Sequence, residues 1–365
     1  IFHREDPTRP VTVGMDQIKA TMESGFGAIL DIPGLNYRLP LYDEAYEKFP
    51  QGFILGSETA STVSSRGIYK FPVEEYKHKQ YDDFQSSSYD LEACNWSNIP
   101  DDDFVWQDDY DWVIGEFVWT GFDYLGEPTP YNYAWPSRSS YFGICDLAGL
   151  PKDRFYLYRS RWNTDDETLH ILPHWNWKGR EGKVTPVFVY TNYNSAELFI
   201  NGKSQGIQKK NKDTNRNRYR LMWMDVKYEP GTVKVVAFDD NGNRVAETEI
   251  HTAGKPHHLK LSADRETILA DGKDLSYITV TVVDKDGNTC PDATNQLNFE
   301  VSGAGSFKAV CNGDATSLEM FHLPTMKAFS GKLVVTIQSL KQAGEIQLVV
   351  KGKGLGAGGI NIRNK

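Results

Sequence analysis

Short apolar runs alternate with helix-like stretches along the first 160 residues of the chain. The apolar runs fall at 11–14, 28–32 and 53–56, and helix-like stretches at 17–24 and 42–49 lie between them. Each apolar run is short and does not alternate with polar residues, which is typical of strands buried on both faces. Strands that alternate with helices predict βα units feeding a parallel sheet.

The pattern changes near residue 165, where the helical periods end and strands of period two begin. Strands are expected at 184–191, 196–200, 220–226 and 233–238. Asn201-Gly202 and Asn241-Gly242 supply the positive φ angles that two-residue hairpin turns require. This region therefore predicts a β-sandwich.

A second region of the same kind follows a linker at 254–256. Its strands are expected at 277–283, 297–301, 332–337 and 345–350. The segment 232–243 is similar to 279–288, so two tandem sandwiches are the simplest interpretation. The chain is thus predicted to be a multidomain α/β plus all-β protein. Its expected parts are an α/β region at 1–163, sandwiches at 164–254 and 255–353, and a flexible tail at 354–365.

Charge and cysteine content exclude several classes of protein. The 365 residues carry 49 acidic and 40 basic side chains, a net charge of -9, so a nucleic-acid partner is not expected. No run approaches the ~18 apolar residues of a membrane-spanning helix. The four cysteines form no C-x-x-C pair and are expected to be structural thiols. A Cys290–Cys311 bridge stays open for an oxidising compartment.

An acidic and aromatic segment at 80–137 is the first sign of function. It contains thirteen carboxylates, many aromatic residues, and no lysine or arginine. Carboxylates accept hydrogen bonds from sugar hydroxyls and aromatic rings pack on sugar C–H faces, so the mixture suits a neutral polyhydroxylated ligand. The alternative is a solvated acidic loop over an ordinary aromatic core. So many carboxylates without a basic neighbour also leave room for a bound cation.

Three strand ends carry the candidate site residues. Glu58 directly follows the apolar run that begins at Phe53, and catalytic groups of (β/α) barrels project from the carboxyl ends of strands. Glu58 is therefore the candidate nucleophile; the alternative is a helix-capping or salt-bridging residue. Asn36 and Tyr37 end another strand, and Trp119 ends a third, where its ring could floor a sugar site.

Four ordered motifs carry a resemblance to a known family. They are Asp6-Pro-Thr-Arg-Pro-Val-Thr12, Gly34-Leu-Asn-Tyr37, Gly56-Ser-Glu-Thr-Ala-Ser61 and Trp119-Thr-Gly-Phe-Asp-Tyr-Leu-Gly-Glu-Pro-Thr-Pro-Tyr131. They resemble the second half of the catalytic barrel of glycoside hydrolase family 2, the β-galactosidase and β-glucuronidase family. The resemblance implies the carboxyl-terminal half of a (β/α)8 TIM barrel over residues 1–162. Two immunoglobulin-like accessory sandwiches would follow it.

The resemblance also implies residue roles. Glu58 would be the nucleophile at the end of the seventh barrel strand, and Tyr37, at the end of the sixth, would hydrogen-bond to it and keep it ionised. Asn36 and Trp119 would line the sugar subsite. In a retaining glycosidase a second carboxyl, about 5–5.5 Å away, protonates the leaving oxygen and later activates water. No cofactor or metal is implied.

The chain departs from the family pattern in one respect. The family's acid/base glutamate follows an asparagine at the end of the fourth strand, and no Asn-Glu pair occurs here. The first four strands and the amino-terminal sugar-binding domains are not recognised either. We therefore expect a carboxyl-terminal portion with little activity alone. The upstream part of the same polypeptide, or a second copy in a homo-oligomer, would complete it. The resemblance favours a periplasmic or secreted location.

The leading hypothesis is a retaining exo-β-glycosidase, with β-galactosidase ahead of β-glucuronidase. A glucuronidase needs cationic groups near the sugar C6 position, and the segment 80–137 has none. The rival from another class is a non-catalytic carbohydrate-binding or adhesion protein. Such a protein would bind sugars without hydrolysing them.

Overall fold

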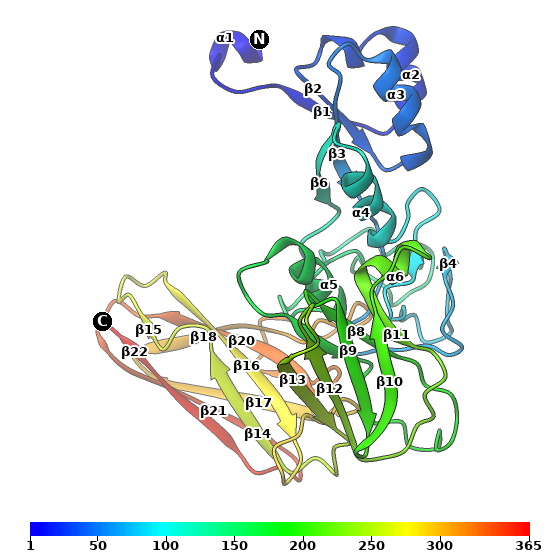
Figure 1. Cartoon of the computed structure of the whole chain (residues 1–365). Helices are drawn as coiled ribbons and strands as arrows, with labels where there is room; N and C mark the ends of the chain where they lie inside the picture. Colours follow the sequence, from blue (N-terminus) through cyan, green and yellow to red (C-terminus); the bar gives the residue numbers. More distant parts are fainter.

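The amino-terminal region contains a four-stranded parallel sheet (Figure 1) in the computed structural model, which describes residues 1–365. The strand order is β1-β2-β3-β6, and all three pairings are parallel, as the alternation of strands and helices predicted. The second strand begins at Ile32 rather than near residue 28, because 27–29 form a 3-10 turn. The strands are β1 (Thr12–Met15), β2 (Ile32–Asn36), β3 (Ile54–Thr59) and β6 (Val113–Val118).

Helices cover one face of this sheet. Leu35, Ile54 and Val113 point into a core shared with Ile18 of α2 and Tyr42 of α3. Three helices contribute to this core: α2 (Ile18–Ser24), α3 (Tyr42–Lys48) and α4 (Pro100–Asp109). The other elements of this region are α1 (Phe2–Glu5), α5 (Asp153–Trp162) and the 3-10 turns η1 (Gly27–Ile29) and η2 (Leu39–Leu41). None of the helices has the length and apolar character needed to cross a lipid bilayer.

The opposite face of the sheet is exposed at its two outer strands, β1 and β6. Val13, Ile114 and Phe117 are 39%, 50% and 66% exposed. β1 and β6 are also the two open edges of the sheet. Open edges and an exposed apolar face are features that folded domains normally cover.

The first sandwich is built from two antiparallel sheets, of order β10-β9-β12-β13 and β11-β8-β7. Asn201 and Gly202 have φ angles of 49° and 76°, so the Asn-Gly pair forms the expected turn between β9 and β10. The elements are β7 (Leu169–Leu172), β8 (Val187–Thr191), β9 (Ser195–Ile200), β10 (Lys203–Lys209), α6 (Asn215–Tyr219), β11 (Arg220–Trp223), β12 (Thr232–Phe238) and β13 (Arg244–His251).

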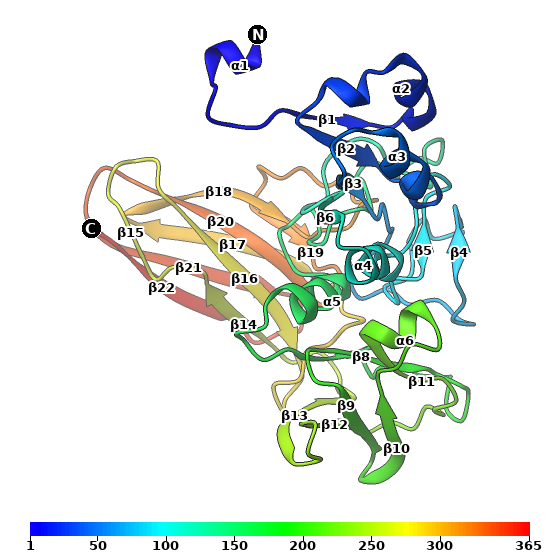
Figure 2. The same cartoon turned by 45° about the horizontal axis from the view of Figure 1, so that its top comes forward.

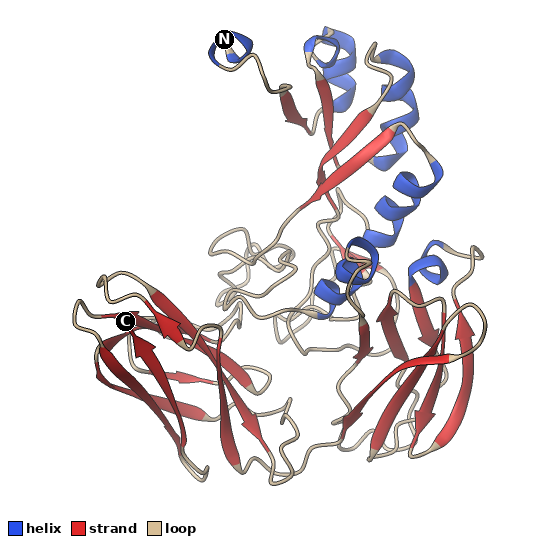
Figure 3. Cartoon of the chain, turned by 60° about the vertical axis from the view of Figure 1, so that its left-hand side comes forward, coloured by secondary structure: helices blue, strands red, loops and turns tan.

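The second sandwich lies beside the first, and the two are separate bodies in Figures 2 and 3. Its sheets have the orders β14-β16-β20-β18 and β15-β22-β21-β17-β19, around a core of 21 buried residues. The strands are β14 (His258–Ala263), β15 (Thr267–Ile268), β16 (Leu275–Val283), β17 (Gln296–Gly303), β18 (Gly305–Cys311), β19 (Thr325–Lys327), β20 (Lys332–Ser339), β21 (Gly344–Gly352) and β22 (Gly358–Asn364). A short pair, β4 (Tyr76–Lys77) and β5 (Glu92–Ala93), lies in the loops after β3.

The prediction of a flexible tail at 354–365 is wrong. Residues 358–364 form β22, which pairs with β21 along its whole length. Ile362 is 1% exposed in the sandwich core and Ile360 packs against it. The alternation of these isoleucines with polar residues is a strand signal, and the glycines before it concealed it.

All four cysteines are free thiols, so the structure contains no Cys290–Cys311 bridge. Burial raises the pKa of both Cys290 and Cys311 to about 11. The thiolate is the reactive form of cysteine, so neither side chain is activated. These residues act as small packing groups.

Candidate active site

The four candidate site residues lie together at the carboxyl ends of β2, β3 and β6. Asn36 is paired in register with Glu58, and the backbone N–H of Tyr37 donates to the Glu58 carbonyl at 2.7 Å. On the other side of β3, the N–H of Trp119 donates to the Thr59 carbonyl at 2.9 Å. Three adjacent strand ends therefore present their side chains at one edge of the sheet.

Tyr37 is held in place by its neighbours, with its hydroxyl available to donate a hydrogen bond to Glu58. The phenol is 6% exposed and accepts a hydrogen bond from Ser61 Oγ at 2.7 Å. Burial raises the pKa of Tyr37, and the nearby Glu58 carboxylate raises it further, although the Ser61 bond opposes both. Because Ser61 supplies its own hydrogen, the phenolic hydrogen remains free for the carboxylate. Ser61 is fixed in turn through its N–H, which donates to Ser97 Oγ at 2.8 Å.

The bend after β2 turns the chain sharply at this point. Tyr37 and Arg38 have φ angles of 55° and 58°, in a region that side chains other than glycine seldom occupy. Such strain is characteristic of functional sites, where the surrounding structure maintains it. The 2.7 Å bond from the Tyr37 N–H to Glu58 provides part of that restraint.

Asn36 lies beneath the same strand ends. Its side-chain oxygen accepts a hydrogen bond from Ser57 Oγ at 2.8 Å, and the residue is 7% exposed. A Cβ at position 14 would lie 2.8 Å from that oxygen, so only glycine in β1 leaves room for the amide. The amide is therefore fixed in orientation by its neighbours on both sides.

Trp119 is oriented by the loop that follows it. Its indole N–H donates to the Tyr124 hydroxyl at 3.2 Å, and Tyr124 donates to Glu127. The Trp119 and Tyr124 rings meet edge to face, 6.1 Å apart. A ring held in this way offers a fixed apolar surface for a ligand.

Sequence reasoning missed the supporting hydroxyls. Ser61 stands in the Gly56–Ser61 motif and could have been proposed from that signal. Ser97 follows no recognisable motif, and its bond to Ser61 joins residues 36 positions apart. Tyr124 and Glu127 lie inside the Trp119–Tyr131 motif, but their orienting role depends on a side-chain contact that the pattern does not reveal.

Part of the acidic segment 80–137 forms ion pairs with other parts of the chain. Several of its carboxylates pair with cations from α5, α6 and β11, or from just before α5. The charges of these carboxylates are countered within the chain, and no cluster of three or more His, Cys, Asp or Glu side chains is placed to hold a metal ion. The pairs include Asp101–Arg220, Asp108–Arg161 (2.8 Å), Asp109–Arg218 (2.7 Å) and Asp123–Lys152 (2.6 Å).

Three carboxyls in the loops after β3 and β6 have raised pKa values. Burial raises the pKa of Asp90 and of Asp123 to about 6, and each has a buried cation nearby, Arg154 at 3.8 Å and Lys152 at 2.6 Å respectively. Burial raises the pKa of Glu92 to about 7, and its Oε1 accepts from the Tyr81 hydroxyl at 2.6 Å. These groups are braced inside the loops, so their pKa shifts have a structural cause.

Glu92 makes the stability of the chain depend on pH. Its pKa is about 7 when folded and about 4.5 when unfolded, so the folded state holds the proton more tightly. Stability should therefore fall as pH rises from about 4.5 to 7, by about 3 kcal/mol from this group. Glu92→Gln should remove that part of the decline. Urea unfolding of the parent and of Glu92→Gln at pH 5 and pH 8 gives the fall in the free energy of unfolding for each protein. An equal fall in the two proteins would contradict the prediction.

Comparisons with known proteins agree with the motifs. The model for "glycoside hydrolase family 2 C-terminal domain 5" matches residues 259–361, and one described as a domain of unknown function (DUF4982) matches 182–246. The β-galactosidase BoGH2A of Bacteroides ovatus is 43% identical over 359 residues. That match covers 96% of this chain and 41% of BoGH2A. A putative β-glucuronidase of Formosa agariphila is 33% identical over 66% of this chain and covers 23% of that protein.

A solved structure shows the same fold. The crystal structure of a β-glycosidase from Bacteroides vulgatus has a TM-score of 0.84 at 30% identity, covering 99% of this chain and 48% of that one. This chain therefore carries carboxyl-terminal domains of glycoside hydrolase family 2. It spans less than half the length of these relatives.

Proposed function

We propose that this chain supplies the nucleophile of a retaining exo-β-glycosidase, with Glu58 in that role. The observation that carries the proposal is the position of Glu58 at the end of a parallel strand, beside Tyr37 and without an ion pair to any cation in the chain. A carboxylate free of cationic partners is available to attack an anomeric carbon. Asn36 and Trp119 would border the sugar.

The reaction would proceed in two displacements. Glu58 attacks the anomeric carbon and forms a glycosyl ester, while a second carboxyl protonates the departing oxygen. In the second step, the same carboxyl, now deprotonated, takes a proton from a water molecule as the water oxygen attacks the anomeric carbon. The bond between that carbon and Glu58 breaks, which releases the sugar and restores the Glu58 carboxylate. We propose that the second carboxyl belongs to another part of the polypeptide.

The exposed outer strands of the parallel sheet support this proposal. Val13, Ile114 and Phe117 would be covered if further strands closed the sheet into a (β/α)8 barrel, of which residues 1–163 would be the carboxyl-terminal half. The sandwiches at 164–254 and 255–353 would then be immunoglobulin-like accessory domains. Closure would also remove the open edges at β1 and β6.

A β-galactoside is the proposed substrate, because the relative named β-galactosidase is 43% identical across nearly all of this chain. A β-glucuronide is the second candidate, because a relative at 33% identity is named putative β-glucuronidase. Rates on nitrophenyl β-galactoside and β-glucuronide distinguish the two. Sugar binding with no hydrolysis of either would favour the non-catalytic alternative.

A covalent trap tests the nucleophile directly. The natural polypeptide that contains these residues is incubated with a 2-fluoro glycoside carrying a good leaving group, and the adduct is located by peptide mass spectrometry. The fluorine slows hydrolysis of the ester, so the label should accumulate on Glu58. Labelling of another carboxylate would overturn the assignment.

Tyr37 should contribute through its hydroxyl alone. Tyr37→Phe removes the donor next to Glu58 and leaves the ring packing unchanged. A hydrogen bond to a charged group is worth about 2 kcal/mol, so kcat/KM should fall ~30-fold. Tyr46→Phe is the matched control, because the Tyr46 ring stacks on Trp112 and its hydroxyl makes no hydrogen bond. Equal activity of the two variants would show that the Tyr37 hydroxyl plays no part.

A further inference from the structure

A second pocket lies next to the candidate active site but has a different lining. Its volume is about 460 Å³, within the ~300–1,000 Å³ range of small-molecule sites. Glu58, Asn36 and Trp119 are not among its lining residues. Arg38, the residue after Tyr37, lines one wall of the pocket. Asn215 of α6, in the first sandwich, lines another. The pocket is thus a junction between two domains, a common location for binding sites.

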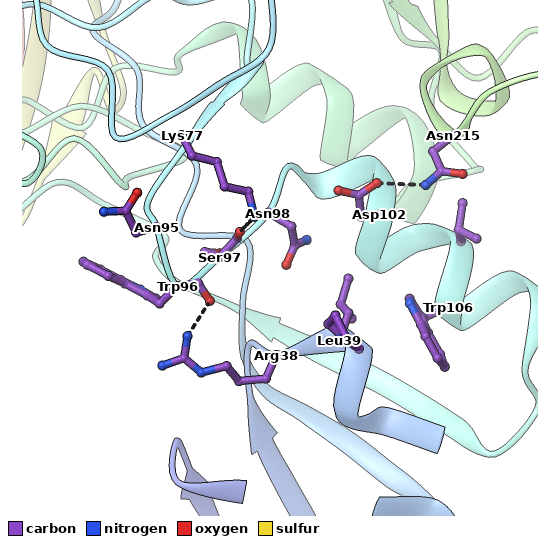
Figure 4. A pocket seen from close by; sticks show the side chains of 12 residues that line it. Arg38, Leu39, Lys77, Asn95, Trp96, Ser97, Asn98, Asp102, Trp106 and Asn215 are labelled. Atoms are coloured by element: carbon purple, nitrogen blue, oxygen red, sulfur yellow. Dashed lines mark hydrogen bonds between the residues drawn. The ribbon is translucent and has the colours of Figure 1, made fainter. Parts of the chain in front are cut away.

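Two indoles line the pocket, on opposite sides of it (Figure 4). Trp96, Arg38 and Lys77 lie on one side and Trp106 on the other, with Asn98 between them. Trp106 is held by Tyr110, which stacks on it at 4.7 Å. Two aromatic rings separated by polar groups match a chain of sugar rings, whose C–H faces and hydroxyls alternate in the same way.

The polar groups of the pocket are fixed before any ligand arrives. Lys77 Nζ donates to the Ser97 carbonyl at 2.7 Å, and Asn215 donates to Asp102 at 2.8 Å. Arg38 donates to the Trp96 carbonyl at 3.2 Å. Each of these groups has hydrogen-bonding capacity left for a ligand. Preorganised side chains lose less conformational entropy on binding, which favours a polar ligand.

The charges in the pocket are nearly balanced. Arg38 is neutralised by Asp16 at 3.1 Å, outside the pocket. Lys77 and Asp102 then contribute one charge of each sign. A balanced site has no electrostatic preference for a polyanion or for an acidic sugar.

We propose that this pocket binds a short neutral oligosaccharide, separately from the residues around Glu58. The site would hold a carbohydrate chain against the protein whether or not Glu58 acts as a nucleophile. The inference goes beyond the proposed hydrolysis and does not depend on it.

Binding measurements on two variants test the proposal in the natural polypeptide that contains residues 1–365. Lys77 is exposed and Asn215 is a surface residue, so Lys77→Ala combined with Asn215→Ala should leave the fold intact. Calorimetric titration uses β-1,4-galactotriose, cellotriose and xylotriose, with a glucuronate-terminated trisaccharide for comparison. Glu58→Gln serves as the background, so that the ligands are not hydrolysed.

At least one neutral trisaccharide should bind with a dissociation constant on the order of 1 mM. The double variant should weaken that binding at least tenfold, and neither Lys77 nor Asn215 is among the residues around Glu58. Three results would overturn the proposal: no binding of any neutral trisaccharide, binding that the double variant retains in full, or tighter binding of the acidic trisaccharide. A circular dichroism spectrum shows whether the double variant is folded.

Discussion

Glu58→Gln should reduce the turnover of a β-glycoside by the natural polypeptide on the order of 10⁴-fold or more, which corresponds to ~5.4 kcal/mol of transition-state stabilisation. The amide has nearly the same shape as the carboxylate, so the contacts with Tyr37 and the strand end can persist. It cannot form the glycosyl ester. The loss should therefore appear in kcat, with little change in substrate affinity.

A matched control separates this effect from a general response to the change. Glu47 is exposed on α3 and makes no ion pair, so Glu47→Gln should leave kcat within twofold of the parent. Thermal unfolding of both variants should match the parent within a few degrees, because neither carboxylate forms a salt bridge. A loss of less than tenfold on Glu58→Gln would remove Glu58 from the role of nucleophile.

The strand ends of the α/β region could be predicted because local signals specify them. Each strand is an apolar run, and the residue that follows it must emerge at the carboxyl edge of the sheet. Glu58, Asn36, Tyr37 and Trp119 were placed on this basis, and the structure brings their backbones within hydrogen-bonding distance of neighbouring strands. Their chemical roles remain proposals.

Long-range charge pairing could not be predicted in the same way. Asp101 and Arg220 are 119 positions apart, and nothing in the local pattern connects them. The acidic segment therefore suggested a sugar surface or a cation site, although many of its carboxylates contact α5 and the first sandwich. The composition of a segment gives its net charge, but it does not show which distant residues form ion pairs with it.

Strands that lack apolar alternation were also missed. All seven residues of β10 are exposed, so Lys203–Lys209 shows no period-two signal. Its pairing comes from the Asn201-Gly202 turn, which returns the chain alongside β9. Here the turn was the useful signal, and the strand that follows it could have been inferred from the turn alone.

Arg220→Met should destabilise the chain by about 3–5 kcal/mol, because it breaks a fully buried ion pair between the first sandwich and α4. Arg220 Nε donates to Asp101 at 2.8 Å, and its other nitrogens donate to the carbonyls of Tyr89 and Asp90 at 2.9 and 3.1 Å. Both side chains of the pair are 0% exposed. Urea unfolding followed by tryptophan fluorescence measures the loss.

The exposed pair Lys351–Glu300 is the control, since its atoms are also 2.8 Å apart but its side chains are 55% and 63% exposed. Lys351→Met should cost less than ~1 kcal/mol, because water screens the interaction. A loss at Arg220 no greater than at Lys351 would show that burial does not determine the strength of these contacts.

A second substitution, at Asp101, distinguishes two possible causes of the stability lost on Arg220→Met. If most of it comes from leaving Asp101 charged and unpaired, Arg220→Met combined with Asp101→Leu should be markedly more stable than Arg220→Met alone. If the double variant is as unstable as the single one, the hydrogen bonds to Tyr89 and Asp90 account for the loss, because both variants leave those carbonyls without a donor. The first result is expected, since an uncompensated buried charge costs more than two unpaired carbonyls.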